Sequence, residues 1–302
     1  SLYSAVKFIE EVKKVYPDAV TLLVGTHPSA LPEETLGLSS SIDAICRPEF
    51  DYIVSAVACP IRDGKNYKDV LGLTYRDDAG NAKSNPDMPY IENLDDIPFA
   101  SKFIKEYLNY KDYFFGASYY PEIQIFTGRG CMAHCNFCVY PQTLHGHKYR
   151  LRSPQNVVDE FQYIADNFPD VKEIVIEDDT FTGNIQRVRD ICQLLIDRGL
   201  SKRMTWLCNA RVNLDYDTMV IMKKAGCRLI IPGLESGSTQ ILKNIKKGTI
   251  LDLIRKYIKN AKKAGLLVHA CYMVGNQGET KETMQETLKL AFELNTDTMQ
   301  FY

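Results

Sequence analysis

Three cysteines lie close together in the middle of a 302-residue chain. Cys131, Cys135 and Cys138 follow a strand-like run, residues 122–126, at C-x3-C-x2-C spacing. Three thiolates in so short a loop can hold three irons of one cubane cluster, whereas a structural zinc or a closed iron–sulfur site requires a fourth protein ligand. No fourth cysteine follows before Cys192. The spacing therefore predicts an iron with an open coordination position, where metal sites do their chemistry.

The loop that carries these cysteines, residues 127–138, leaves two other interpretations open. It could be a zinc site with His134 as a further ligand, or its cysteines could simply be buried, because cysteine is common in protein interiors. Phe137, directly before the last cysteine, completes the segment TGRGCMAHCNFC. This segment resembles the signature loop of the radical S-adenosylmethionine (SAM) enzymes. The resemblance implies that the three cysteines hold a [4Fe–4S] cluster, that its free iron chelates SAM, and that Phe137 lies at the cofactor.

Composition limits the class of protein. The chain is 45% hydrophobic and 25% charged, which predicts a globular protein with a sizeable core in one large or two moderate domains. A net charge of -2 argues against nucleic acid as a partner. No apolar run is long enough to span a membrane, and the first 18 residues form an amphipathic pattern rather than a signal peptide. Nine cysteines, mostly scattered, favour a reducing compartment and hence a cytoplasmic location.

The N-terminal part of the chain carries a second candidate site. A short apolar strand, residues 19–24, ends in Gly25, Thr26 and His27. Ligands of α/β folds bind where parallel strands end, although a plain strand-to-loop turn is the simpler interpretation of these residues alone. The segment is similar to the second half of the cobalamin-binding domain in one radical SAM subgroup. The resemblance implies that Gly25, Thr26 and His27 contact cobalamin.

These patterns predict two domains joined by a linker. Residues 1–98 are expected to form the C-terminal part of a Rossmann-like cobalamin-binding domain, with a hairpin over residues 71–84. Residues 99–120 are expected to be a linker, whose many tyrosines could line an aromatic substrate channel or pack between domains. Residues 121–302 are expected to form the radical SAM core barrel, truncated at its C-terminal end.

Strand and helix patterns alternate along the second domain. The expected strands are residues 122–126, 173–176, 204–208, 228–231, 267–274 and a last one from 298. The expected helices cover residues 153–167, 185–198, 216–225, 249–264 and 280–294. Such alternation predicts a parallel sheet with right-handed crossovers, and we expect an α/β fold with a partial, TIM-like (β/α)6 barrel. Catalytic groups of such barrels lie at the carboxyl ends of the strands.

Polar residues follow these strand ends. Glu177 and Asp178 could hold the ammonium of SAM or a substrate hydroxyl, or could cap the next helix. Arg211 offers a planar fork suited to a carboxylate such as that of the methionine moiety. Glu235 and Ser236, between two glycines, could accept hydrogen bonds from ribose hydroxyls. By contrast, the lysine-rich stretch 243–263 is interpreted as the solvated face of helices.

The resemblance extends over residues 122–302. The Gly-Leu-Glu-Ser-Gly run and the Gly-x-x-Gly-Glu-Thr run are similar to those of the cobalamin-type subgroup, which includes methyltransferases and the anaerobic oxidative cyclase of bacteriochlorophyll synthesis. Residues 140–150 are most similar to the hopanoid-biosynthesis type. The resemblance implies reductive cleavage of SAM to a 5′-deoxyadenosyl radical, which takes hydrogen from a small-molecule or lipid-like substrate.

The same resemblance implies further partners. Cobalamin would serve as methyl carrier or electron partner, and a flavodoxin or ferredoxin would supply electrons. A different class also stays open from the sequence: a non-catalytic iron–sulfur or zinc protein whose cysteine loop is structural or senses redox state. Cleavage of SAM separates the two classes.

Overall fold

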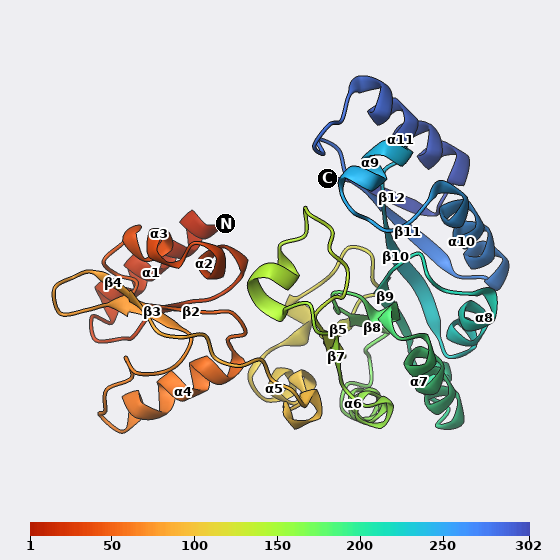
Figure 1. Cartoon of the computed structure of the whole chain (residues 1–302). Coiled ribbons are helices and arrows are strands. Elements are labelled where there is room, and N and C mark those ends of the chain that lie inside the picture. The colour runs from red at the N-terminus through yellow and green to blue at the C-terminus, as the bar shows by residue number, and fades with distance from the viewer. The chain divides into compact units, whose positions relative to one another are not determined.

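The computed structural model describes every residue of the chain, Ser1–Tyr302, and divides it into two compact units (Figure 1). The first unit comprises residues 1–92 together with 138–148, and the second comprises residues 93–137 together with 149–302. None of the helices combines the length and the apolar character that crossing a membrane requires.

The first unit contains a four-stranded sheet of order β1-β2-β3-β4, in which β1 and β2 are parallel and β3 and β4 follow antiparallel. The strands are β1 (Leu22–Leu23), β2 (Ala44–Cys46), β3 (Leu73–Arg76) and β4 (Ala82–Ser84). The helices are α1 (Leu2–Val15), α2 (Thr26–Ala30), α3 (Pro32–Gly37) and α4 (Asp51–Arg62), and a π-helical turn, η3 (Pro141–His145), also belongs to this unit. The hairpin predicted over residues 71–84 is confirmed by the pairing of β3 with β4.

The second unit is built on a six-stranded parallel sheet whose order, β5-β8-β9-β10-β11-β12, follows the chain. The strands are β5 (Glu122–Ile125), β8 (Glu173–Ile176), β9 (Thr205–Ala210), β10 (Cys227–Glu235), β11 (Leu267–Tyr272) and β12 (Thr298–Phe301). The long helices are α6 (Pro154–Asn167), α7 (Ile185–Asp197), α8 (Tyr216–Lys224), α10 (Leu251–Ala264) and α11 (Lys281–Leu294). The predicted α/β class with a parallel sheet is confirmed, and its curvature into a partial barrel stays a prediction.

Shorter elements complete the second unit. They are α5 (Ala100–Tyr107), α9 (Thr239–Asn244), the strands β6 (Gly128–Arg129) and β7 (Arg150–Leu151), and the 3-10 turns η1 (Leu94–Asp96), η2 (Tyr110–Asp112), η4 (Phe181–Gly183) and η5 (Leu200–Lys202). Strands β6 and β7 pair with each other, and the segment between them contains the three cysteines and η3.

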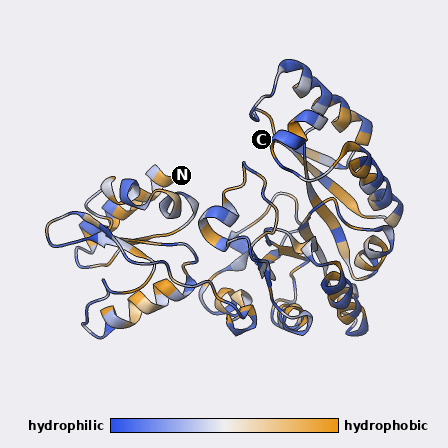
Figure 2. Cartoon of the chain, in the orientation of Figure 1, coloured by the Kyte–Doolittle hydropathy of each residue, from blue (hydrophilic) through white to orange (hydrophobic).

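The two faces of the parallel sheet pack differently, because successive side chains of a strand point to opposite faces. On one face, residues such as Ile125, Ile174 and Trp206 form a large core with the helices, which follow one another along the outer side of the sheet in Figure 1. Figure 2 shows that these helices carry both hydrophobic and hydrophilic residues, as helices with one buried side must. On the other face a smaller cluster lies around Val175 and Leu207.

Residues 99–120, predicted to be a linker, belong instead to the second unit. Helix α5 lies against α6, and the Ser101 hydroxyl donates a 2.8 Å hydrogen bond to the buried Glu160. Phe115 and Ala117 pack against the small cluster on the inner face of the sheet. The segment therefore packs on the sheet of the second unit through Phe115 and Ala117.

Candidate functional site

The cysteine loop begins where β5 ends, at the carboxyl edge of the parallel sheet. Cys135 is buried, and Cys131 and Cys138 are half-buried. Cys138 is the first residue of the short segment that groups with the first unit, whereas the other two cysteines belong to the second unit. The structure gathers no three metal-ligating side chains into one group. Ligation of a cluster by the three cysteines therefore stays a prediction from their chemistry and spacing.

Asp178, which follows β8, holds the first residues of this loop. Its carboxylate is 1% exposed and accepts hydrogen bonds from the Thr127 amide (2.6 Å), the Thr127 hydroxyl (2.6 Å) and the Gly128 amide (3.0 Å). Burial raises the pKa of Asp178, and the hydrogen bonds from Thr127 oppose that rise. A Cβ on Gly128 would lie 2.8 Å from Leu151 Cδ2 and 3.3 Å from the Arg150 carbonyl, so a larger residue would have to displace the Leu151 side chain. Asp178, predicted to contact SAM, thus lies beneath the loop with its oxygens bonded to the loop backbone.

Two buried arginines brace the same stem. Arg187 of α7 donates to the Thr127 carbonyl (2.7 Å) and to the Arg152 carbonyl (2.9 Å). Arg152 donates to the Phe126 carbonyl (2.7 Å) and forms an ion pair with the Glu160 carboxylate (2.5 Å). The Thr127 carbonyl also accepts from the Arg152 amide (3.0 Å), so backbone and guanidinium donors together satisfy the carbonyls of the stem. Neither arginine was a candidate in the sequence, where both sit on helices or loops with no distinguishing spacing.

Glu177 is the half-buried carboxyl next to this anchor. Burial raises the pKa of Glu177, the negative charge of Glu122 adds to the rise, and a hydrogen bond from Asn209 opposes it. A bound cation would favour the ionised form of such a group. Glu177 therefore retains the chemistry expected of a residue that meets the ammonium of SAM.

Arg211, after β9, reaches across to the turn that follows α9. One of its guanidinium nitrogens, Nη2, donates to the Lys247 carbonyl (3.0 Å), and its amide donates to the Thr182 hydroxyl (2.9 Å). The remaining donors of the planar fork are compatible with a carboxylate ligand.

Glu235 ends β10 in a conformation that non-glycine residues rarely adopt, with φ at +63°. Its carboxylate is 7% exposed, and Oε1 lies 2.6 Å from the Lys247 ammonium. Ser236 is fully buried, shares a 3.0 Å hydrogen bond with the Thr287 hydroxyl and accepts one from the Ser238 amide. Ser236 therefore supports the turn after the strand, and Glu235 is the residue of the pair that faces the site.

The second half of the cysteine loop is tied to the turn after α9. The Asn136 amide and side chain donate to the carbonyls of Ile245 (3.2 Å) and Asn244 (3.0 Å). The Lys247 ammonium lies 5.9 Å from the centre of the Phe137 ring. Three predicted site residues, Phe137, Arg211 and Glu235, are thus brought together around Lys247.

Lys247 is the residue that the sequence interpretation missed. The stretch 243–263 was expected to be solvated, and six of its lysines are exposed, but Lys247 is 9% exposed. The periodicity argument does not apply to Lys247, because α9 ends at Asn244 and Lys247 lies in the turn after it. Outside a helix, helical periodicity does not predict which side chains are buried.

The first unit holds the other predicted site, at Gly25, Thr26 and His27. Gly25 has φ at +114° and is the N-cap residue before α2, and a Cβ placed on it would meet no atom within 4 Å. The space beside the Gly25 backbone is thus open, and the contact of these residues with cobalamin stays a prediction. The turn η3, which follows Cys138, contacts α2 within this unit.

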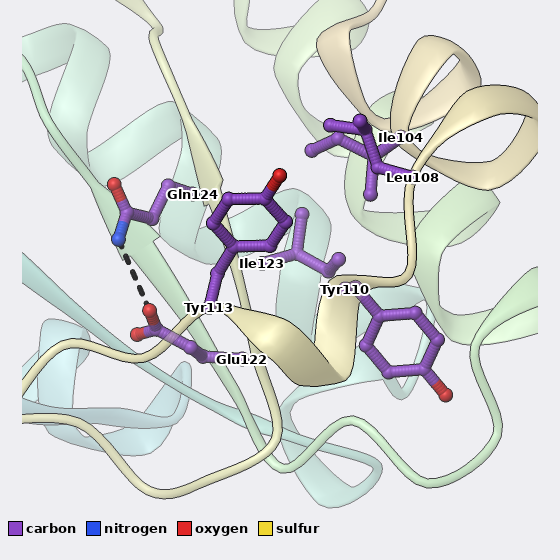
Figure 3. A pocket seen from close by; sticks show the side chains of 7 residues that line it. All are labelled: Ile104, Leu108, Tyr110, Tyr113, Glu122, Ile123 and Gln124. Atoms are coloured by element: carbon purple, nitrogen blue, oxygen red, sulfur yellow. Dashed lines mark hydrogen bonds between the residues drawn. The ribbon is translucent and has the colours of Figure 1, made fainter.

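A cavity of about 170 Å³ lies at the other end of β5 (Figure 3). Its lining is mostly apolar and aromatic and consists of Ile104, Leu108, Tyr110, Tyr113, Glu122, Ile123 and Gln124. The two polar residues form a pair, in which the Gln124 side chain donates a hydrogen bond to the Glu122 carboxylate (3.0 Å). The cysteine loop follows the last residue of this strand, whereas the cavity surrounds its first residues. The cavity is therefore separate from the candidate site, although it contains two of the tyrosines that suggested an aromatic channel.

Comparison with known proteins gives the family. Residues 125–291 match the model of the Radical SAM superfamily. Among curated relatives, an uncharacterized methyltransferase of Pyrococcus horikoshii is 30% identical over 100% of this chain and 64% of its own length. The anaerobic magnesium-protoporphyrin IX monomethyl ester cyclase of Rubrivivax gelatinosus is 29% identical over 98% of this chain and 53% of its own. The cytidylyl-2-hydroxyethylphosphonate methyltransferase of Streptomyces wedmorensis is 28% identical over 95% and 59%.

Solved structures share the fold over almost the whole chain. The radical SAM methyltransferase TsrM of Kitasatospora setae, with tryptophan and a SAM analogue bound, has a TM-score of 0.81 and 16% identity over 99% of this chain and 58% of its own. The cobalamin-dependent SAM radical enzyme OxsB has a TM-score of 0.76 and 20% identity over 95% and 41%. The chain spans 53 to 64% of the length of the three curated relatives named above.

The match to the family model covers more than half of the chain and begins in the strand that precedes the cysteine loop. Members of this family use SAM and a [4Fe–4S] cluster. Both the resemblance inferred from the cysteine loop and the expected cofactors are confirmed at the level of the family, and nothing supports the non-catalytic alternative. This chain belongs to the radical SAM superfamily.

Proposed function

We propose that the protein containing this chain cleaves SAM reductively and takes hydrogen from a small-molecule or lipid-like substrate. The observation that carries the proposal is the bracing of the cysteine loop at the carboxyl edge of the parallel sheet, by Asp178 and Arg187 on one side and Asn136 on the other. The loop lies at the same sheet edge as Glu177, Arg211 and Glu235, and the charges of Glu177 and Arg211 are opposite to those of the ammonium and carboxylate of SAM.

Different residues would bind the cluster and the two charged groups of SAM. Cys131, Cys135 and Cys138 would hold three irons of the cluster, whose donor set of thiolates suits an iron–sulfur centre. Arg211 would pair with the carboxylate of SAM, and Glu177 would meet its ammonium. When bound, the reduced cluster supplies the electron that breaks the bond between the sulfonium and C5′ of SAM.

Exclusion of water is the second task of the protein, because a primary radical attacks whatever lies within reach. Phe115 and Ala117 cover the inner face of the sheet next to Val175, Leu207 and Leu229. This apolar layer lies towards the amino ends of the strands and blocks solvent from that side.

Cobalamin is proposed as a second cofactor, held in the first unit by Gly25, Thr26 and His27. The open strand end at Gly25 supports this, and TsrM and OxsB, which share the fold, are described with cobalamin bound. Methyl transfer and oxidative cyclisation are both compatible with the relatives, and the hopanoid-type substrate suggested by residues 140–150 stays a prediction. A flavodoxin or ferredoxin would supply the electron.

The first test is anaerobic reconstitution with iron and sulfide, followed by electron paramagnetic resonance of the dithionite-reduced protein with and without SAM. We expect a cubane signal that shifts on addition of SAM, and 5′-deoxyadenosine in the product. Cys135→Ala should lose the signal, whereas Cys59→Ala, at an exposed cysteine outside the loop, should keep it. If the cluster signal did not change on addition of SAM, or if the loop bound zinc instead, the proposal would be wrong and a structural or redox-sensing role would be favoured.

The cobalamin proposal has its own test. Hydroxocobalamin mixed with the protein and passed through a desalting column should co-elute with its corrin absorbance. The His27→Ala variant should weaken binding, and the absence of corrin from the wild-type protein fraction would contradict the proposal.

A further inference from the structure

We propose that the cavity beside the first residues of β5 (Figure 3) binds a small primary amine, whose ammonium meets the Glu122 carboxylate and whose body is a single apolar ring. The cavity lies at the other end of the strand from the cysteine loop, and nothing in the proposed function uses it. The size of the cavity, its apolar wall and its buried carboxylate each restrict the ligand.

The first observation is the size of the cavity. Its volume is about 170 Å³, and an apolar cavity of about 150 Å³ is enough to bind benzene. There is room for one ring with a short polar arm, but not for SAM or a corrin. The residues that line the cavity all belong to the second unit, so its shape does not depend on the first unit.

The second observation is that the apolar wall is already formed. Ile123 is 2% exposed, and Ile104 packs against the same core. The Tyr110 hydroxyl donates to Asp170, which does not line the cavity, and the Tyr110 ring packs edge-on against Phe168 with the centroids 5.1 Å apart. The ring of Tyr110 is thus held as part of the wall. A preformed wall binds an apolar group at a low cost in ordering.

The third observation is a buried carboxylate without a cation. Glu122 lines the cavity and is 3% exposed. Its Oε1 accepts a hydrogen bond from the uncharged Gln124 amide (3.0 Å), and its Oε2 is buried without a hydrogen-bond partner. Buried charges in proteins are usually paired, because an unpaired one is costly to remove from water. A ligand that brings a positive charge would supply the missing partner.

Glu173, on the neighbouring strand β8, shows how the protein compensates a carboxylate at this end of the sheet. Glu122 and Glu173 are register partners, so their side chains lie on the same face of the sheet. Arg228 donates to both oxygens of Glu173 (2.7 and 2.6 Å) and forms its ion pair there. Two adjacent carboxylates thus share one face, and the guanidinium is bonded to Glu173 and not to Glu122.

The fourth observation is the place of the aromatic rings. In the view of Figure 3, the Tyr113 ring lies between the Glu122–Gln124 pair and the aliphatic side chains at the end of α5. The cavity therefore has a polar end and an apolar end. Because the face of a tyrosine ring attracts a cation within about 6 Å, the two tyrosines favour an ammonium over a neutral group of the same size.

The test compares benzylamine with benzyl alcohol, a neutral molecule of the same shape, by NMR titration of the reconstituted protein at pH 7. Benzylamine should bind with a Kd of about 1 mM or below, and benzyl alcohol at least about tenfold more weakly, as expected for a hydrogen bond to a charged group. Glu122→Gln keeps the shape of the side chain and should reduce this preference to less than about threefold. Glu106→Gln, at an exposed carboxylate of α5, should leave the preference unchanged.

Leu108→Trp tests the location of the bound amine. Leu108 lines the cavity and is 39% exposed, so a larger side chain can fill the cavity without entering the core. Benzylamine binding should fall at least about tenfold in this variant.

Four results would each overturn the proposal. They are no binding of benzylamine by the wild-type protein, equal binding of the two ligands, a full preference in Glu122→Gln, and unchanged binding in Leu108→Trp. The wild-type comparison needs no variant, so it decides the question even if a variant does not fold. Cleavage of SAM is measured separately, so failure here leaves the proposed function untouched.

Discussion

The two ends of the six-stranded sheet each bury a carboxylate against a cation, with different results. At the amino end, Glu173 accepts two hydrogen bonds from Arg228 (2.7 and 2.6 Å), one from the Tyr119 amide (2.8 Å) and one from the Thr205 hydroxyl (2.8 Å). Arg228 also lies 4.2 Å from the centre of the Tyr119 ring. Every oxygen of this carboxylate is bonded within the protein.

At the carboxyl end, Glu235 has a single ion-pair partner, and the pKa of Glu177, which follows β8, is raised. A buried ion pair is thus no sign of function in itself. What distinguishes the carboxyl end, where the candidate site lies, is the smaller number of protein hydrogen bonds to its carboxylate, beside a loop with three cysteines. The amino end, covered by residues 113–120, supplies stability instead.

The largest effect is expected from breaking the pair at the amino end. Arg228→Met leaves Glu173 buried without its cation, and we expect a loss of about 3–5 kcal/mol in the free energy of unfolding. Urea denaturation measures this loss. SAM binding by the protein that remains folded should not change, because the carboxyl end is untouched.

The matched control is Arg255→Met. Arg255 makes the same two-point contact with Glu293 (2.6 and 3.0 Å), but on the surface, where the pair is screened by water. This variant should leave stability almost unchanged. Equal losses in both variants would mean that burial does not distinguish the two pairs.

An intermediate effect is expected at the stem of the cysteine loop. Asp178→Ala removes three hydrogen bonds and leaves the amides of Thr127 and Gly128 without partners, so we expect a loss of about 2–4 kcal/mol and less iron bound per chain. Thr127→Val removes only the hydroxyl contact and should cost about 1 kcal/mol. Iron analysis after reconstitution, together with denaturation, checks both. Full iron content in Asp178→Ala would show that the loop does not depend on this anchor.

The smallest effect concerns Glu177 and pH. Because the folded protein raises the pKa of this carboxyl above its ordinary value of 4.5, the protonated form is favoured on folding, and stability is lost as pH rises through the raised pKa. Glu177→Gln should therefore be more stable than wild type at neutral pH, by about 1 kcal/mol or less once solvent screening is considered. The difference should vanish below pH 4.5. Thermal unfolding between pH 4 and 8 measures this difference in stability. If Glu177→Gln were less stable than wild type at neutral pH, the prediction would be wrong.

The sequence alone determined the local elements and the family. Periodicity predicted the six strands of the sheet and the hairpin of β3 and β4, because alternation along the chain reports which face of an element is buried. The C-x3-C-x2-C spacing at residues 131–138 indicated the chemistry, because ligands in one short loop need no tertiary structure to be close together.

Only the tertiary structure decided which polar side chains are bonded within the protein. Asp178 meets Thr127 across 51 residues, and Arg187 meets the same residue across 60, so no pattern in either neighbourhood predicts the contact. Residues 99–120 were assigned to a linker for the same reason, since their partners on the sheet are distant in the chain. Lys247 lies beside Glu235 and is buried, whereas the other lysines of the stretch 243–263 are exposed. The burial of a charge depends on its partner, and partners far apart along the chain meet only when it folds.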